Sequence, residues 1–115
     1  MTRGRLILAI AMVSALGLVA ATGGVAGARA STTIQVDDDF FSPDSKTVSK
    51  GTKVKFKWVG TDEHDVVKKS GPGGAFGSGP TDAPGVNFSK KFKKVGKYKI
   101  ICTLHEGMKM KLKVK

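Results

Sequence analysis

The chain of 115 residues carries a formal net charge of +11, and its single cysteine excludes an intramolecular disulfide. A basic charge of this size suggests nucleic-acid binding. Beyond residue 30, however, the sequence has 17 lysines, no arginine and few aromatic side chains. We therefore interpret the lysines as a solvated surface and expect no nucleic acid as a partner.

The first 30 residues have the pattern of a secretory signal peptide. Arg3 and Arg5 precede an apolar segment at 6–21, and Ala28-Arg29-Ala30 resembles a cleavage site. A membrane anchor is the alternative, but the apolar run is shorter than the roughly 20 residues that a span needs. We expect an exported protein, in the periplasm or outside the cell, with residues 31–115 as one domain.

Residues 31–115 alternate between apolar and polar side chains with a period of two, which is typical of strands with one buried face. The clearest examples are KVKFKW at 53–58 and MKMKLKVK at 108–115. Further strands are expected at 32–36, 65–69, 86–92 and 98–102. Turn residues separate these short segments, and the Gly/Pro-rich stretch 70–85 is expected to be a long loop. The fold class is therefore all-β, as an antiparallel β-sandwich.

The end of the sequence places ligand-capable side chains around one tight turn, Cys102-x-x-His105-x-x-Met108. His64 lies 38 residues before Cys102 and follows the loop after the strand at 53–58. A sandwich could bring these strand ends together, giving two imidazoles, a thiolate and a thioether, as in blue-copper sites. Zinc is the rival metal, but it seldom accepts a thioether. A buried free thiol, a surface histidine and core methionines remain the non-metal alternative.

Three segments resemble the cupredoxin family of small bacterial blue copper proteins, the plastocyanin, amicyanin and pseudoazurin group. They are FFSPDSKTVSKGTKVKFKW, WVGTDEHDV and GKYKIICTLHEGMKMKLKV, within a resemblance that covers roughly 34–115. The resemblance implies a Greek-key β-sandwich that binds one copper ion. It also implies His64, Cys102, His105 and a methionine as the copper ligands.

The resemblance leaves two candidates for the methionine ligand. Met108 fits the shorter ligand loop of the family, and Met110 fits the longer one. Similar proteins often have a small residue two positions after the ligand and then two alternating aliphatic residues. Leu112 and Val114 occupy those aliphatic positions if Met108 is the ligand. We therefore favour Met108 and expect Met110 to pack in the core.

The sequence departs from the family near the expected site. Asp65 stands where the family commonly has asparagine, and its charge would favour the oxidised metal. Ile101 stands where plant plastocyanins have an aromatic residue, so an electron route through that residue is not implied. Glu106 adds a negative charge beside His105.

We expect a monomeric one-electron carrier that cycles between Cu(II) and Cu(I). No catalytic acid, base or nucleophile is arranged in the sequence, so no enzymatic activity is expected. Electrons are expected to pass through His105 at a small apolar patch near Leu104, while lysines attract a redox partner with an acidic docking face. A copper chaperone or buffer is the first alternative, and Met110 would be an additional donor for it. A basic structural module without a metal is the second.

Overall fold

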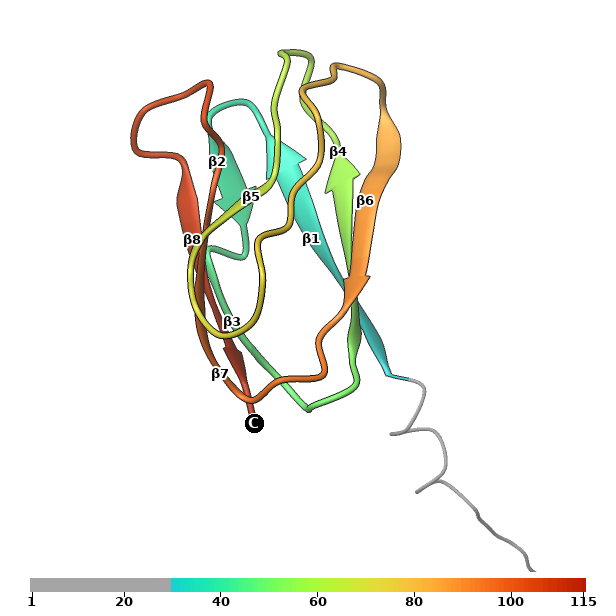
Figure 1. Cartoon of the computed structure of the whole chain (residues 1–115). Helices are drawn as coiled ribbons and strands as arrows, with labels where there is room; N and C mark the ends of the chain where they lie inside the picture. Colours follow the sequence, from blue (N-terminus) through green and yellow to red (C-terminus); the bar gives the residue numbers. More distant parts are fainter. Residues whose placement is uncertain (1–29) are drawn as a thin grey trace, which may run out of the picture.

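The computed structural model describes residues 30–115, which form two four-stranded sheets packed face to face (Figure 1). The expected signal peptide falls almost entirely on residues 1–29, outside the described part of the chain. The strands are β1 (Ser31–Asp37), β2 (Phe40–Ser42), β3 (Ser45–Val48), β4 (Lys53–Trp58), β5 (Val67–Ser70), β6 (Gly85–Lys91), β7 (Gly96–Ile101) and β8 (Lys109–Val114). Within the described residues, no helix is long and apolar enough to cross a membrane. The expected all-β sandwich is confirmed.

The two sheets have the strand orders β2-β1-β4-β6 and β3-β8-β7-β5. Most neighbours are antiparallel, but β1 pairs with β4 in parallel and β3 pairs with β8 in parallel. These parallel pairs arise because the chain crosses between the sheets instead of continuing to the next strand, which is the connectivity of a Greek key. Both sheets are therefore mixed, whereas the sequence pattern had indicated antiparallel pairing.

Each of the six strands expected from the sequence is present, with bounds within two residues of the expected ones. Strands β2 and β3 were not among the segments singled out by alternation. They have only three and four residues, and Pro43 lies between them. Segments this short carry too little periodicity to be recognised from sequence.

The core lies between the sheets and is built from the apolar residues of the alternating strands. Val54, Phe56 and Trp58 of β4 are buried, while the lysines between them point outward. In β8, Met110, Leu112 and Val114 are buried in the same way. Burial of each large apolar side chain contributes on the order of 1.5–3 kcal/mol. β4 and β7 belong to different sheets, and both run toward the same end of the sandwich (Figure 1).

The segment 70–85 is a long connection, as expected, but part of it runs alongside the residues that precede and begin β5. The Ser78 amide donates to the Val66 carbonyl at 2.8 Å, and the amides of His64 and Thr81 each donate to the other residue's carbonyl at 3.0 Å. A Cβ on Gly77 would lie only 2.8 Å from the Val66 carbonyl oxygen, so this close approach requires glycine. The loop therefore fixes the backbone at His64.

The outer face of the β7–β8 pair places like charges opposite each other. Lys97 is opposite Lys113, and Lys99 is opposite Lys111. Directly opposed like charges destabilise a strand pair. This arrangement lowers the stability of the β7–β8 pair and makes its outer face strongly cationic.

Replacing Lys99 with glutamate should stabilise the domain, because Lys99→Glu turns a repulsion with Lys111 into an attraction. The free energy of unfolding should rise by about 0.2–1 kcal/mol, measured by urea denaturation at low ionic strength. The gain should shrink in high salt. The matched control is Lys93→Glu, in the loop between β6 and β7. An equal gain in both variants would show that net charge alone, and not the opposed pair, sets the effect.

Candidate metal centre

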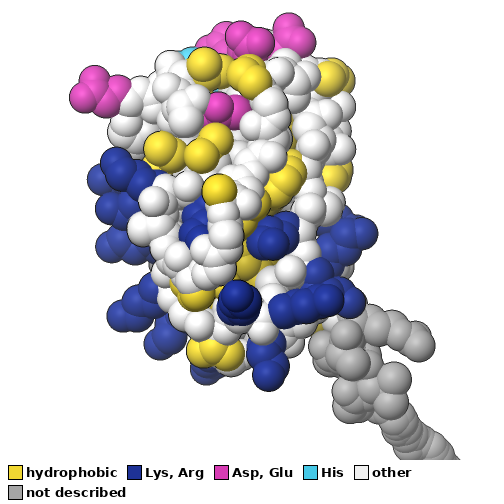
Figure 2. Space-filling model, viewed as in Figure 1, with side chains coloured by type: hydrophobic (Ala, Val, Ile, Leu, Met, Phe, Trp, Pro, Cys, Tyr) yellow, Lys and Arg dark blue, Asp and Glu magenta, His cyan; other side chains and the backbone are white. Residues whose placement is uncertain are grey.

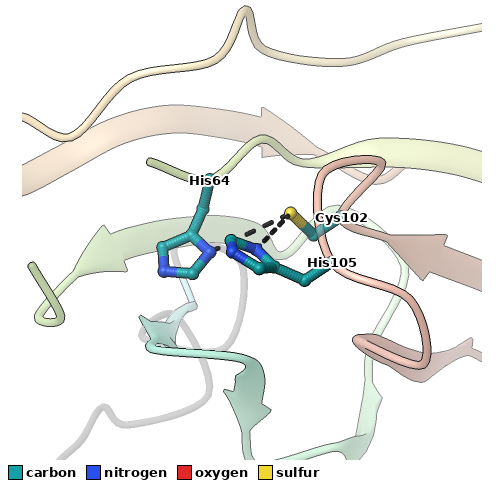
Figure 3. Close-up of side chains that lie close together, drawn as sticks. All are labelled: His64, Cys102 and His105. Carbon is teal, nitrogen blue, oxygen red and sulfur yellow. Dashed lines mark hydrogen bonds between the residues drawn. The ribbon is translucent and has the colours of Figure 1, made fainter. Parts of the chain in front are cut away.

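Three ligand-capable side chains converge at one end of the sandwich. Nδ1 of His64 lies 3.9 Å from Sγ of Cys102, and Nδ1 of His105 lies 3.6 Å from the same sulfur. Donor atoms of all three residues lie within 4.8 Å of one another. Figure 3 shows both rings turned toward the sulfur, with His64 coming from a different segment from the other two. The structure thus brings together the two histidines and the cysteine that the sequence singled out.

The loop 102–108 closes tightly because it makes its own backbone hydrogen bonds. Cys102 follows directly on β7, and its amide donates to the Met108 carbonyl at 3.0 Å. The Met108 amide in turn donates to the His105 carbonyl at 3.2 Å. Gly107 has a φ of 85°, a left-handed conformation that glycine adopts without strain. This turn brings the His105 ring back to the sulfur of Cys102.

His64 is fully buried, and its ring is held from the side opposite Cys102. Its Nε2 lies 3.0 Å from a carboxylate oxygen of Asp38, in the turn between β1 and β2. A carboxylate can only accept, so Nε2 carries the proton and donates it. Nδ1 is then left with its lone pair directed toward Cys102. The contact therefore selects the tautomer that can bind a metal through Nδ1.

Asp38 can play this part because it is held as a carboxylate. Backbone amides of Asp62 and Thr61 donate to it at 2.9 and 3.0 Å, and these bonds, with the contact to His64, keep the pKa of Asp38 well below its ordinary value of 3.8. Gly60 makes room for this arrangement, because a Cβ there would overlap the Asp38 carboxylate. Asp38 thus fixes both the ring of His64 and the segment just before it.

His105 has a related arrangement but lies closer to the surface. Its Nε2 lies 3.3 Å from a carboxylate oxygen of Asp39, the next residue in the same turn. The His105 side chain is 28% exposed, whereas that of His64 is 0% exposed. Both rings therefore direct Nδ1 to the sulfur and Nε2 to adjacent aspartates, and His105 is the one that reaches solvent.

Asp65 links the two segments that carry the candidate ligands. Its carboxylate accepts a hydrogen bond from the Thr103 amide at 2.7 Å and another from the Thr103 hydroxyl. Asp65 is 4% exposed and adjoins His64, while Thr103 adjoins Cys102. The carboxylate thus steadies the loop that carries Cys102. Its buried negative charge favours the more positive state of a nearby metal.

The two methionines lie at different places relative to these residues. Met108 is buried at the end of the loop that holds Cys102 and His105. Met110 is also buried, but it lies within β8 opposite Ile100 of β7. Only Met108 therefore belongs to the loop that carries the cysteine and the second histidine.

Asp38 and Asp39 were not recognised as contributors to the site from the sequence. The run Asp37-Asp38-Asp39 at the end of the first strand was the available signal. Its meaning depends on β1 pairing with β4, since that pairing brings the β1–β2 turn next to the segment after β4. A local pattern does not report such a pairing.

The donor set fits copper better than the other common metals. One thiolate and two imidazoles suit copper in both of its oxidation states, whereas a carboxylate-rich set would suit magnesium or calcium. The fold and the cysteine-histidine cluster together define a cupredoxin-like protein.

Comparison with known sequences agrees with this class. Residues 28–115 match the family of copper binding proteins described as plastocyanin/azurin. The chain belongs to the plastocyanin/azurin family of copper-binding proteins. Its cofactor is accordingly one copper ion. A search of curated protein sequences gives no match.

Several solved structures share the fold. A purple cupredoxin from Nitrosopumilus maritimus has a TM-score of 0.64 at 21% identity, and the match covers 73% of this chain and 99% of that one. A reduced amicyanin variant has a TM-score of 0.66 at 20% identity, covering 74% of this chain and 82% of that one. A copper-containing nitrite reductase from Thermus scotoductus has a TM-score of 0.63 at 25% identity over 73% of this chain. The chain spans only 22% of that reductase.

Replacing Asp38 with asparagine should reduce stability in a pH-dependent way. Because the folded pKa of Asp38 is lowered, the carboxylate stabilises the fold above its ordinary pKa, and this contribution fades as the pH falls below 3.8. In Asp38→Asn the loss of unfolding free energy should therefore be largest above about pH 5 and should shrink toward pH 2. Urea denaturation of the copper-free protein across this range measures it.

The control variant is Asp44→Asn, which removes the same charge from the connection between β2 and β3. It should leave the pH dependence close to that of the original protein. A loss of stability in Asp38→Asn that stays constant down to pH 2 would contradict the account.

Proposed function

We propose that the chain is an exported type 1 blue copper protein that carries single electrons, with His64, Cys102, His105 and Met108 as copper ligands. The observation that carries the proposal is the convergence of two imidazole nitrogens on one thiol sulfur at 3.6 and 3.9 Å. This is the donor set that describes blue-copper sites when a weak thioether completes it. Bound copper supplies the chemistry by cycling between Cu(II) and Cu(I).

The protein's own part is to hold the donors in one arrangement for both oxidation states. Asp38 holds the ring of His64, Asp65 holds the backbone at Thr103, and the loop 102–108 closes on itself. Little has to move when the charge of the site changes, and a small rearrangement keeps the barrier to electron transfer low. These fixed contacts support a carrier in preference to a protein that must release its metal.

Met108 is the proposed fourth residue to hold copper, because it ends the loop that carries Cys102 and His105. Met110 lies two residues further along β8 and pairs with Ile100 in the interior of the sheet. We assign Met110 to core packing. This assignment also weakens the alternative of a copper chaperone or buffer, for which Met110 would have been an additional donor.

His105 is the proposed point of electron exchange. It is the candidate ligand that is partly exposed, and Leu104 beside it is 44% exposed. The exposed ring edge and the adjacent apolar side chain support the small apolar contact surface expected from the sequence. Electron transfer at this edge requires no substrate pocket, so we propose a carrier and not an enzyme.

Localisation and assembly remain proposals drawn from the sequence. The pattern of residues 1–30 supports export and cleavage before Ser31, and residues 31–115 then act alone as a monomer in the periplasm or outside the cell. From net charge alone, the 17 lysines would attract a redox partner with an acidic docking face, as expected from the sequence. They lie outside the loops that carry the candidate ligands, so such a partner would meet the flanks of the domain first.

Replacing Cys102 with serine should abolish the intense visible absorption of the copper protein. The chain has one cysteine, so Cys102→Ser removes the only thiolate that can bond to copper. The absorption spectrum with one equivalent of Cu(II) measures the effect, and circular dichroism shows whether the variant remains a folded β protein. An unchanged visible band in a folded variant would rule out the assignment of Cys102.

A pair of methionine variants separates the methionine that would bind copper from the one that packs in the core. Met108→Leu should raise the reduction potential, because loss of the weak thioether donor disfavours Cu(II). We expect a shift above about 59 mV, a tenfold change for one electron. Met110→Leu should leave the potential nearly unchanged and cost less than about 1.5 kcal/mol of stability. The reverse pattern, measured by voltammetry, would assign Met110 instead.

A further inference from the structure

The charges of the domain are separated between its two ends. The end that carries the candidate ligands consists of the segments 37–39, 59–66, 80–84 and 102–107, called the copper end below. Eight of the nine acidic residues of the chain lie at the copper end, and none of the chain's 17 lysines lies there. The eight are Asp37, Asp38, Asp39, Asp62, Glu63, Asp65, Asp82 and Glu106. Figure 2 shows acidic side chains gathered at this end and lysines over the flanks and the opposite end.

The separation follows from which parts of the chain carry each charge. Most lysines lie on the strands, where those of β4 and β8 alternate with core residues, and the others lie in turns or at the chain end. The eight acids lie at the end of β1 or in the connections that meet around the candidate ligands. Asp39, Asp62, Glu63, Asp82 and Glu106 are all exposed there. The surface around His105 is therefore negative although the protein as a whole is positive.

Apolar side chains are exposed at or beside the same end. Leu104 is 44% exposed, Val59 is 41% exposed, and Phe40, directly after Asp39, is 52% exposed. Figure 2 shows apolar side chains next to the acids on this end. Apolar residues within a charged rim are the composition of a protein docking surface. The partly exposed His105 ring lies among them.

We propose that the copper end docks a basic protein surface, in which lysine or arginine side chains surround an apolar centre. The inference rests on the proposed electron carriage. Lys69, Lys99 and Lys109 line one hollow with Leu104 and His105 and are the lysines nearest to the copper end. Charges are screened beyond about 8 Å at physiological ionic strength, so the acids next to His105, with Asp39 only 3.3 Å from its ring, outweigh the lysines beyond that hollow once two surfaces approach. A basic partner repels the lysine-covered flanks and attracts the copper end. The charge separation therefore orients the protein with His105 toward the partner.

An acidic partner is the competing occupant, and it would bind the flanks. The lysines of the β7–β8 face would then form the contact, and His105 would point away from the partner. A second copy of the chain is another occupant, since its cationic flank could meet the copper end.

The test uses cytochrome c with its lysine-rich haem edge as a basic reporter, and the same cytochrome with succinylated lysines as an acidic one. Reversible bleaching and reoxidation with small redox reagents first establishes that the copper protein carries electrons. Stopped-flow mixing of the Cu(I) protein with each oxidised cytochrome then gives second-order rate constants. The native cytochrome should react at least tenfold faster, and its rate should fall as salt is added. A faster reaction with the succinylated form would overturn the proposal.

Two variants with the same change in charge locate the contact. Glu63→Lys, at the copper end, should slow the reaction with native cytochrome several-fold at low salt. Asp44→Lys, between β2 and β3, should change it less than twofold. Equal slowing in both variants would show that net charge governs the encounter and would overturn the proposal.

Amide chemical shifts of the Cu(I) protein provide a readout that does not depend on electron transfer. Adding native cytochrome c should shift amides of the copper end, including Leu104 and Glu63. Shifts confined to β7 and β8, or concentration-dependent self-association through the copper end, would overturn the proposal.

Discussion

The rest of the site depends on the hydrogen bond between His64 and Asp38. It joins the β1–β2 turn to the segment after β4, and it sets the orientation and tautomer of a fully buried imidazole. The same carboxylate accepts the amides of Thr61 and Asp62, so the segment is held by its backbone as well as by the ring. Without this contact, the His64 ring would lose the hydrogen bond that sets its orientation and tautomer relative to Cys102.

The other contacts of the site extend this constraint to the cysteine loop. Asp65 ties the His64 segment to Thr103, and the Thr81 backbone pairs with His64 from the other side. Trp58, at the end of β4, donates from its ring nitrogen to the Thr81 carbonyl at 2.8 Å and adds a further link. The core of the sandwich is thus continuous with the site. A ligand set held in this way can serve two oxidation states without rearrangement.

Much of this arrangement was readable from the sequence, because it rests on local patterns. The alternation of apolar and polar residues predicted the bounds of β4. The spacing of Cys102, His105 and Met108 predicted the turn that brings the His105 ring to the Cys102 sulfur. The parallel pairs, the short strands β2 and β3, and the role of Asp38 depend on contacts between distant segments. The backbone pairing of 76–81 with 64–68 is of the same kind, since a Gly/Pro-rich loop has no pattern that reports its partner. Net charge was also a poor guide to the surface around His105, because it averages lysines on strands with acids in loops.

The central claim is that Cys102 and the two histidines hold a copper ion whose charge can change reversibly. The visible absorption spectrum of residues 31–115 with one equivalent of Cu(II), before and after ascorbate, tests it most directly. The account predicts an intense band that bleaches on reduction and returns on reoxidation. A colourless protein that binds only Cu(I), or one that binds neither state, would contradict it.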